Sequence, residues 1–189
     1  MGFLEELKAN DKKGLFRSDD NTVSFPTGFH ALDYANGYYQ TVKINGEYKH
    51  IRRLGIPPGF TTIIGSSGVG KSTFCLGAGW NIVKRFSNGQ FIYVDCEKTM
   101  TKQRIIEVTG ASPEDPRITL MKERTAIEDV LELLDEICER KEANKNEIQI
   151  EIKDQSLDGK PYKIYPPTVV VIDSLPSFNG RDYDDTSLG

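Results

Sequence analysis

The sequence predicts an α/β protein in which a mainly parallel β-sheet is flanked by helices. Strand-like apolar runs alternate with helix-like runs along most of the 189 residues, and parallel strands with crossover helices produce this order. Residues 168–173 read Thr-Val-Val-Val-Ile-Asp, an almost continuous apolar run that is typical of strands buried on both faces. A glycine-rich loop at residues 65–70 also joins an expected strand to an expected helix.

Each expected core element has its own pattern. Apolar and β-branched residues predict core strands over residues 60–64, 90–95, 118–121 and 168–173. Apolar residues at helical spacing predict helices over residues 72–84, 99–109 and 125–142. The last helix has the clearest pattern, and its buried face is expected to carry Ile127, Val130, Leu131, Leu134, Ile137 and Cys138. A short strand and a helical turn are expected before these elements, at residues 22–25 and 28–34.

Two peripheral β-hairpins are expected near residues 38–53 and 146–165. The first contains an Asn-Gly pair and the second an Asp-Gly pair, both typical of hairpin turns. The first hairpin mixes basic and tyrosine side chains, which leaves two interpretations open: a nucleic-acid contact and a solvated hairpin edge. Residues 1–21 are expected to form an N-terminal arm or linker and are a candidate oligomerisation segment. Residues 22–189 form the expected core domain.

Composition places the chain among ordinary soluble proteins. The formal net charge is −4 and the pI is about 5.3, so bulk charge argues neither for nor against a nucleic-acid partner. Three widely spaced cysteines and two histidines form no metal-binding motif, so no zinc site is expected, and this cysteine usage fits a reducing cytoplasm. No apolar run approaches the roughly 18 residues that a membrane span requires, so no membrane partner is expected.

Residues 65–72 read Gly-Ser-Ser-Gly-Val-Gly-Lys-Ser, which fits the phosphate-binding pattern G-x-x-x-x-G-K-[ST]. In such a loop, backbone N–H groups and a helix N-terminus face the phosphates of a nucleotide. Lys71 is expected to reach the β- and γ-phosphates, and the Ser72 hydroxyl to ligate Mg²⁺. The alternative is a turn without a ligand, but the expected flanking strand and helix favour the motif. The residues expected to bind ATP here are Gly65, Ser66, Ser67, Gly68, Val69, Gly70, Lys71, Ser72 and Thr73.

Two carboxylates are expected to complete this site. Asp173 ends an apolar strand, where a carboxylate can hold Mg²⁺ together with Ser72; a simple helix or turn cap is the alternative. Glu97 follows the strand at 90–95, so it is expected at the sheet edge where ligands bind. It would activate the attacking water, although a solvated turn residue has the same spacing. Arg104 lies on the following helix and either stacks on adenine or faces solvent.

Several segments match motifs of a known family. Phe-Pro-Thr-Gly-Phe-His-Ala-Leu-Asp at residues 25–33 and Gly-Ile-Pro-Pro-Gly-Phe at 55–60 lead into the loop, and Phe-Ile-Tyr-Val-Asp-Cys-Glu at 91–97 resembles a strand that delivers a catalytic glutamate. Val-Ile-Asp-Ser-Leu at 171–175 is similar to a magnesium-binding strand. Together these segments resemble the RecA-like recombinase and ATPase family, most of all the recombinases of large bacteriophages. The resemblance runs from Phe25 to Asn179.

The resemblance implies a RecA-like P-loop NTPase core. The activity that it implies is that of an ATP-dependent DNA recombinase, which forms a filament on single-stranded DNA, pairs it with double-stranded DNA and hydrolyses ATP with Mg²⁺. Glu97 and Lys71 would then be catalytic, Ser72 and Asp173 would bind the metal, and Arg104 would contact adenine, as in an E-x-T-x-x-x-x-R element. A phage-encoded protein would act in the cytoplasm of its bacterial host.

Two other functions share several of these motifs: a hexameric replicative helicase motor, and a KaiC-like regulatory ATPase that does not bind DNA. The sequence also departs from the family pattern. Both hairpins are long, and the chain stops at Gly189, before the later strands and the DNA-holding loops of the family. The C-terminal part of the core is therefore expected to be missing from this chain.

Overall fold

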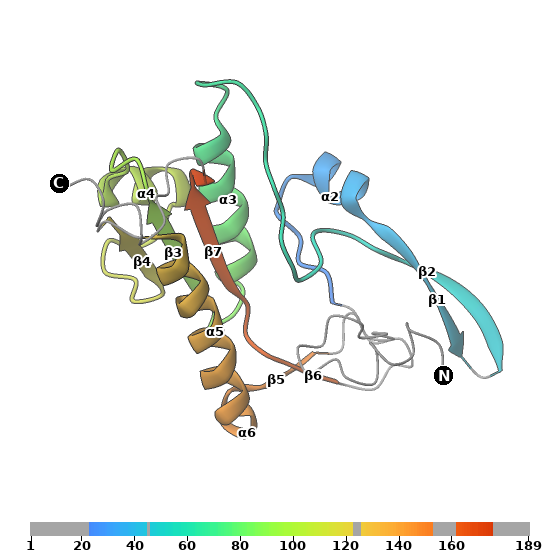
Figure 1. The fold of residues 1–189 in the computed structure, drawn as a ribbon. Helices are drawn as coiled ribbons and strands as arrows, with labels where there is room; N and C mark the ends of the chain where they lie inside the picture. The colour runs from blue at the N-terminus through green and yellow to red at the C-terminus, as the bar shows by residue number, and fades with distance from the viewer. Residues whose placement is uncertain (1–22, 45, 123–125, 153–161, 176–189) are drawn as a thin grey trace, which may run out of the picture.

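The computed structural model describes residues 23–44, 46–122, 126–152 and 162–175 (Figure 1). Its centre is a three-stranded parallel sheet in the order β4-β3-β7. The strands are β3 (Gln90–Asp95), β4 (Ile118–Met121) and β7 (Thr168–Asp173). The bounds of all three strands agree with the sequence prediction. The expected α/β class, a parallel sheet flanked by helices, is therefore confirmed.

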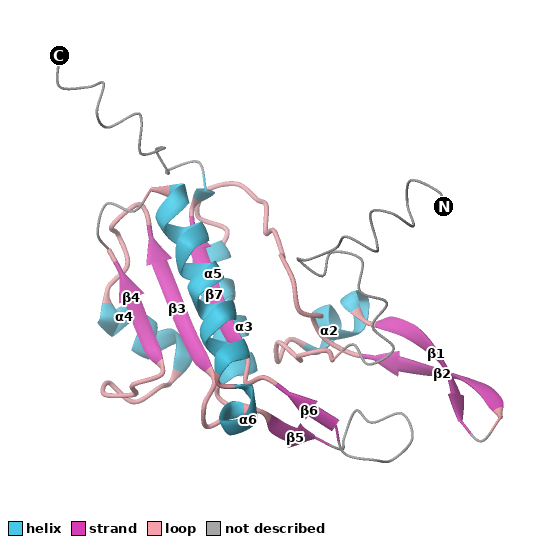
Figure 2. Ribbon diagram, turned by 60° about the horizontal axis from the view of Figure 1, so that its bottom comes forward, coloured by secondary structure: helices cyan, strands magenta, loops and turns pink. Residues whose placement is uncertain are grey.

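Helices cover both faces of this sheet (Figure 2). One face packs against α3 and α4, and the other packs against α5. The helices that follow residue 70 among the described residues are α3 (Lys71–Val83), α4 (Lys102–Thr109), α5 (Ile127–Ala143) and the short α6 (Lys145–Ile148). Each helix within the described residues is too short or too polar to serve as a membrane span.

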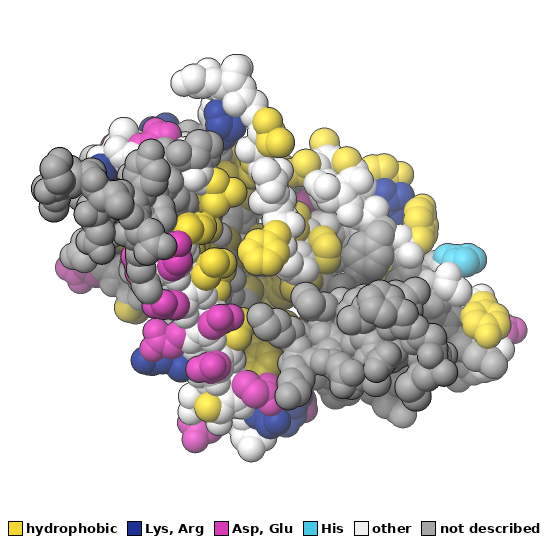
Figure 3. Space-filling view, in the orientation of Figure 1, with side chains coloured by type: hydrophobic (Ala, Val, Ile, Leu, Met, Phe, Trp, Pro, Cys, Tyr) yellow, Lys and Arg dark blue, Asp and Glu magenta, His cyan; other side chains and the backbone are white. Residues whose placement is uncertain are grey.

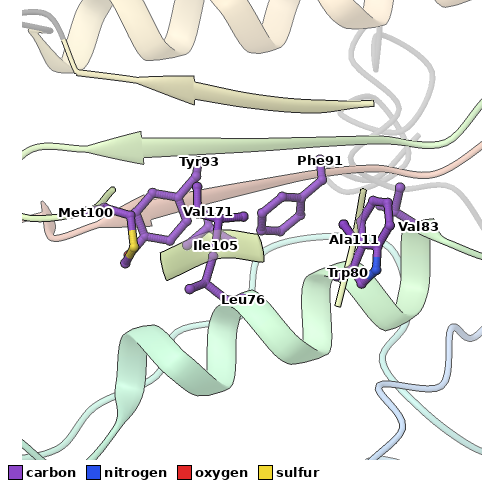
Figure 4. Packing of buried hydrophobic residues seen from close by; sticks show 9 residues of the cluster. All are labelled: Leu76, Trp80, Val83, Phe91, Tyr93, Met100, Ile105, Ala111 and Val171. Carbon is purple, nitrogen blue, oxygen red and sulfur yellow. The ribbon is translucent and has the colours of Figure 1, made fainter. Parts of the chain in front are cut away.

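The alternation of β3 explains why the sheet has two covered faces. Phe91 and Tyr93 are fully buried against α3 and α4, as Figure 4 shows, whereas Ile92 and Val94 face α5. Gly79 allows α3 to lie this close, because a Cβ at that position would come within 2.5 Å of the Phe91 ring. Because successive side chains of β3 point to opposite faces, apolar residues of this one strand pack against helices on both faces of the sheet.

The segment that precedes the hairpin is held by a buried carboxylate. Asp33 lies on α2 (His30–Asn36) and accepts hydrogen bonds from the Thr27 backbone N–H at 2.8 Å and the Thr27 hydroxyl at 2.6 Å. The Thr27 carbonyl in turn accepts a bond from Asn81 on α3 at 2.8 Å. This chain of bonds ties the predicted entry motif to the helix that begins at the glycine-rich loop.

Both expected hairpins are present, although the second begins later than the expected residue 146, because Lys145–Ile148 form α6. The first consists of β1 (Tyr38–Ile44) and β2 (Glu47–Arg53), and the second of β5 (Ile150–Ile152) and β6 (Tyr162–Ile164); each pair is antiparallel. Figures 1 and 2 show both hairpins outside the parallel sheet. The expected Asp-Gly turn of the second hairpin and the expected arm at residues 1–21 lie outside the described residues.

Three expectations about local structure were wrong. Residues 60–64 form no strand: they run as an extended loop in which Phe60 is 93% and Ile64 91% exposed, because no neighbouring strand pairs with them. The expected strand at 22–25 is reduced to a single bridge between Phe25 and Ile56. On α5 the packed residues are Val130, Leu133 and Ile137, whereas Leu131 and Cys138 are exposed.

Candidate functional site

The candidate site lies at the carboxyl ends of β3 and β7. These ends are adjacent, since Asp95 pairs with Asp173 and the Cys96 backbone N–H donates to the Asp173 carbonyl at 2.9 Å. Glu97 follows β3 by two residues and accepts a hydrogen bond from the Ser174 hydroxyl at 3.2 Å. The predicted acidic residues Glu97 and Asp173 are thus brought to one edge of the sheet, where ligands of open α/β sheets bind.

Asp173 connects this edge to the glycine-rich loop. Its Oδ2 accepts a hydrogen bond from the Ser72 hydroxyl at 2.5 Å, across 101 positions of sequence. The same oxygen accepts a bond from the Tyr93 hydroxyl. Ser72 is the second residue of α3, so the contact joins the end of the loop motif directly to the end of β7.

Tyr93 is a site residue that the sequence analysis missed. Its ring belongs to the core, and burial together with the hydrogen bond to Asp173 raises the pKa of its phenol far above the ordinary value. The phenol therefore stays a hydrogen-bond donor and fixes the orientation of the carboxylate. Tyr93 lies on the same face of β3 as Phe91, which is the one sequence signal that could have placed it near α3.

The Ser72 hydroxyl and the Asp173 carboxylate suit Mg²⁺, which prefers oxygen ligands. Within the described residues no cluster of three or more His, Cys, Asp or Glu side chains could enclose a metal ion. Mg²⁺ beside a nucleotide usually keeps several waters and takes phosphate oxygens, so it needs few protein ligands. The donor set present is therefore of the kind that a Mg·nucleotide complex requires.

The loop at residues 65–70 is exposed along its whole length. Gly68 and Gly70 adopt left-handed backbone angles, with φ of 77° and 90°, and a Cβ at either position would meet nothing within 4 Å. Gly70 caps α3 without a side-chain hydrogen bond, which leaves the first N–H groups of the helix facing the loop. A loop of this geometry can present backbone donors to an anion.

Lys71 lies against this loop rather than against the sheet. Its Nζ donates to the Gly65 carbonyl at 2.9 Å and to the Ser66 carbonyl at 2.8 Å. The ammonium charge is thus positioned over the loop by neutral acceptors only. A phosphate would be a stronger partner for the same charge, because its negative charge adds Coulomb attraction to the hydrogen bond.

Asp95 shapes the turn that carries Glu97. It is only 2% exposed and accepts hydrogen bonds from the backbone N–H groups of Thr99 at 3.2 Å and Met100 at 2.7 Å. Lys122 lies 3.9 Å from the same carboxylate and balances its charge. Asp95 therefore holds the turn that contains Glu97, and the sequence analysis did not single it out.

Among the described residues, no contact joins the Arg104 side chain to the loop at residues 65–70. Its side chain is about half exposed and forms an ion pair with Glu107, one turn further along α4, at 3.6 Å. The Arg104 backbone N–H is bonded to the Thr101 hydroxyl that caps the helix. A contact between Arg104 and adenine therefore stays a prediction.

A cavity of about 250 Å³ lies apart from these residues, near the other end of α3. It is lined by Val23, Phe25, Ile82, Phe86 and neighbouring residues, and it contains none of the predicted site residues. Volume alone is thus a poor guide here, and the convergent polar groups at the sheet edge define the candidate site.

Comparison with known proteins does not identify the chain: no family model, no curated protein and no solved structure matches it. The structure by itself establishes an α/β fold whose parallel three-stranded sheet is flanked by helices. Such a core is compatible with Rossmann-like and P-loop-like proteins.

Proposed function

We propose that this chain binds Mg·ATP at the loop formed by residues 65–70 and hydrolyses it as the ATPase part of a RecA-like DNA recombinase. The observation that carries the proposal is the 2.5 Å hydrogen bond between the Ser72 hydroxyl and the Asp173 carboxylate. It joins a phosphate-loop motif to an acidic strand end, two features that the sequence predicted separately. In a glycine-rich turn without a ligand, a contact between the following serine and a carboxylate 101 residues away would not be expected.

Binding uses the loop and the first turn of α3. The backbone N–H groups of residues 65–70 would hold the β-phosphate, and Lys71 would leave the Gly65 and Ser66 carbonyls to bind the γ-phosphate. Ser72 and Asp173 would hold Mg²⁺, which when bound supplies charge neutralisation to the β- and γ-phosphate oxygens. Tyr93 would keep the Asp173 carboxylate in place.

Hydrolysis uses Glu97 as general base. Its carboxylate would accept a proton from a water molecule while the water oxygen attacks the γ-phosphorus, and the bond to the β,γ-bridging oxygen breaks to release ADP. Ser174 and the turn built on Asp95 orient Glu97 toward the edge shared with Asp173. The proposed base and the proposed metal ligand Asp173 would therefore share the sheet edge at the carboxyl ends of β3 and β7.

The recombinase part of the proposal rests on the family resemblance. Filament formation on single-stranded DNA, pairing with double-stranded DNA and subunit contacts around ATP would belong to the whole recombinase. A ring-forming helicase motor and a KaiC-like regulatory ATPase would use the same nucleotide chemistry. DNA dependence and the shape of the assembly separate these three functions.

Electron microscopy of the chain with a slowly hydrolysed ATP analogue, Mg²⁺ and single-stranded DNA tests this part. Helical filaments that require both ligands are the expected result. Closed rings would favour the helicase or the regulatory ATPase instead, and monomers under all conditions would contradict recombinase assembly by this chain. Glu97→Gln, which should slow hydrolysis and prolong the ATP state, offers a second preparation in which filaments should be more abundant.

A further inference from the structure

We propose that one face of the hairpin β1–β2 binds single-stranded DNA through its exposed tyrosines and basic side chains. The site is separate from the nucleotide-binding residues, because the hairpin lies outside the parallel sheet (Figures 1 and 2). The choice of DNA over RNA rests on the proposed function, but the stacking and charge arguments below do not. No residue of this hairpin has a role in the proposed ATPase mechanism.

The charge of the hairpin is opposite to that of the whole chain. Residues 38–53 contain four basic residues and one acidic residue, a formal net charge of +3, whereas the chain as a whole carries −4 and the remaining residues therefore carry −7. Figure 3 shows Asp and Glu side chains gathered over α5, away from the hairpin on the same face of the molecule. A polyanion would thus be attracted to the hairpin in spite of the negative charge of the whole chain.

The strand register places aromatic and basic side chains on one face. Tyr39 pairs with Arg52 and Thr41 pairs with His50, and residues directly opposite each other in an antiparallel pair share a face. The pairs are in contact: Arg52 Nη1 donates to the Tyr39 hydroxyl at 3.0 Å, and the Thr41 hydroxyl lies 3.0 Å from His50 Nδ1. Tyr48 follows on the same face, two residues before His50.

The tyrosines of this face are exposed although they are large. Tyr39 is 65% and Tyr48 73% exposed, and Tyr34, beside the base of the hairpin, is 61% exposed. Among the described residues of this face there is no leucine, isoleucine or phenylalanine that a protein partner could bury. Tyrosine rings interleaved with cations are instead the composition that stacks bases and follows a phosphate backbone.

Arg52 connects the two tyrosines nearest to it. Its guanidinium lies over the Tyr34 ring at 3.8 Å and over the Tyr39 ring at 5.1 Å, and its Nη2 donates to the Tyr34 carbonyl at 2.6 Å. Tyr34 and Tyr39 as residues remain more than half exposed, so they keep surface that a base could cover. Because the arginine is already ordered, less conformational entropy is lost when a strand binds.

Fluorescence anisotropy with a labelled oligothymidylate of 15 nucleotides, measured in the absence of ATP, tests this inference. Replacing both Tyr39 and Tyr48 by alanine should weaken binding by about tenfold or more, whereas replacing both by phenylalanine keeps the rings and should change it by less than about threefold. Binding should also weaken between 50 and 200 mM salt, since phosphate contacts release counterions. Circular dichroism and unaltered binding of an ATP analogue would show that the alanine variant is folded.

Equal affinity of the alanine variant and the wild-type protein for oligothymidylate would overturn the inference, as would no measurable binding by the wild-type protein at low salt. Equal binding of a duplex of the same length would overturn the stacking argument. Lys71→Ala separates this inference from the proposed function. That variant should lose ATP binding and keep oligothymidylate binding. The two binding sites are therefore tested independently.

Discussion

Two apolar segments, residues 60–64 and the strand β7, have similar composition and different structures. Every residue of β7 pairs with β3, and Val171 is buried in the core. Residues 60–64 pair with no strand, and the side chains of Phe60 and Ile64 are more than nine-tenths exposed. An apolar run therefore becomes a strand only where a neighbour satisfies its backbone N–H and C=O groups, and composition does not reveal that neighbour.

The same contrast divides the candidate site. On the side of β7, the Ser72 hydroxyl and the Asp173 carboxylate are already in contact, and Tyr93 holds the carboxylate. On the side of residues 60–64, the loop is exposed and Lys71 is bonded to the carbonyls of its own loop. The sheet-side half of the site is thus assembled by the fold, while the loop-side half would gain its strongest partners from phosphate.

The largest effect is expected at the assembled half of the site. Glu97→Gln removes the general base but keeps the size and shape of the side chain, so the rate of ATP hydrolysis should fall by about 100-fold or more while nucleotide affinity is retained. Steady-state phosphate release and fluorescent-nucleotide titration measure the two quantities. Glu114→Gln, at an exposed turn, is the control; a normal turnover number in Glu97→Gln would exclude this residue as the base.

A smaller effect is expected when the metal ligand is changed. Asp173→Asn keeps the hydrogen bonds to Ser72 and Tyr93 within reach but loses the negative charge, so the Mg²⁺ concentration needed for half-maximal hydrolysis should rise about 10- to 100-fold. A magnesium titration of the ATPase rate measures this shift. Asp135→Asn on the exposed face of α5 should leave the titration unchanged, and an unchanged titration in Asp173→Asn would place the metal elsewhere.

Replacing an isoleucine by alanine should cost more stability in the parallel sheet than in the unpaired residues 60–64. Ile92→Ala on β3, the strand that pairs with β7, should lower the free energy of unfolding by about 2 to 4 kcal/mol, because it leaves a cavity in the core. Ile64→Ala should change it by less than about 0.5 kcal/mol, since that side chain is exposed. Urea denaturation of both variants measures the difference, and equal losses would show that residues 60–64 are packed in solution.

A pH effect is expected at Tyr93. Because its pKa is raised in the folded protein, the folded state holds a proton that the unfolded chain releases above about pH 10. The stability contributed by the neutral phenol is therefore complete below that pH and is lost as the pH rises further. In an absorbance titration at alkaline pH, one tyrosine should ionise only with unfolding; Tyr93→Phe should remove that late step, and a titration that is the same in both proteins would contradict the assignment.

Much of this fold follows from local patterns. The bounds of β3, β4 and β7 and the presence of both hairpins could be predicted, because apolar runs and turn dipeptides are local signals. The contact between Ser72 and Asp173 could be anticipated from the two motifs, although only folding brings their atoms together. Tyr93 and Asp95 could not be identified in advance, because their roles depend on neighbours that are distant in sequence or on backbone donors in a turn.

The α5 helix shows the limit of periodicity within a predicted element. Leu131 and Leu133 are both apolar and only two residues apart, so spacing alone permits either side chain to face the sheet. The structure buries the face of Val130, Leu133 and Ile137 against Ile92 and Val94, and it leaves Leu131 exposed. The position of the sheet, which lies outside the helix sequence, decides between them.

The central claim is that the glycine-rich loop binds the phosphates of ATP, and the affinity of Lys71→Ala for Mg·ATP tests it most directly. Isothermal titration calorimetry should show tight binding by the wild-type protein and by Lys84→Ala, an exposed lysine at the other end of α3. Lys71→Ala should bind on the order of 100-fold more weakly, because a charged partner of the phosphates is lost. Unchanged affinity in Lys71→Ala would contradict the claim and leave residues 65–70 as an ordinary turn.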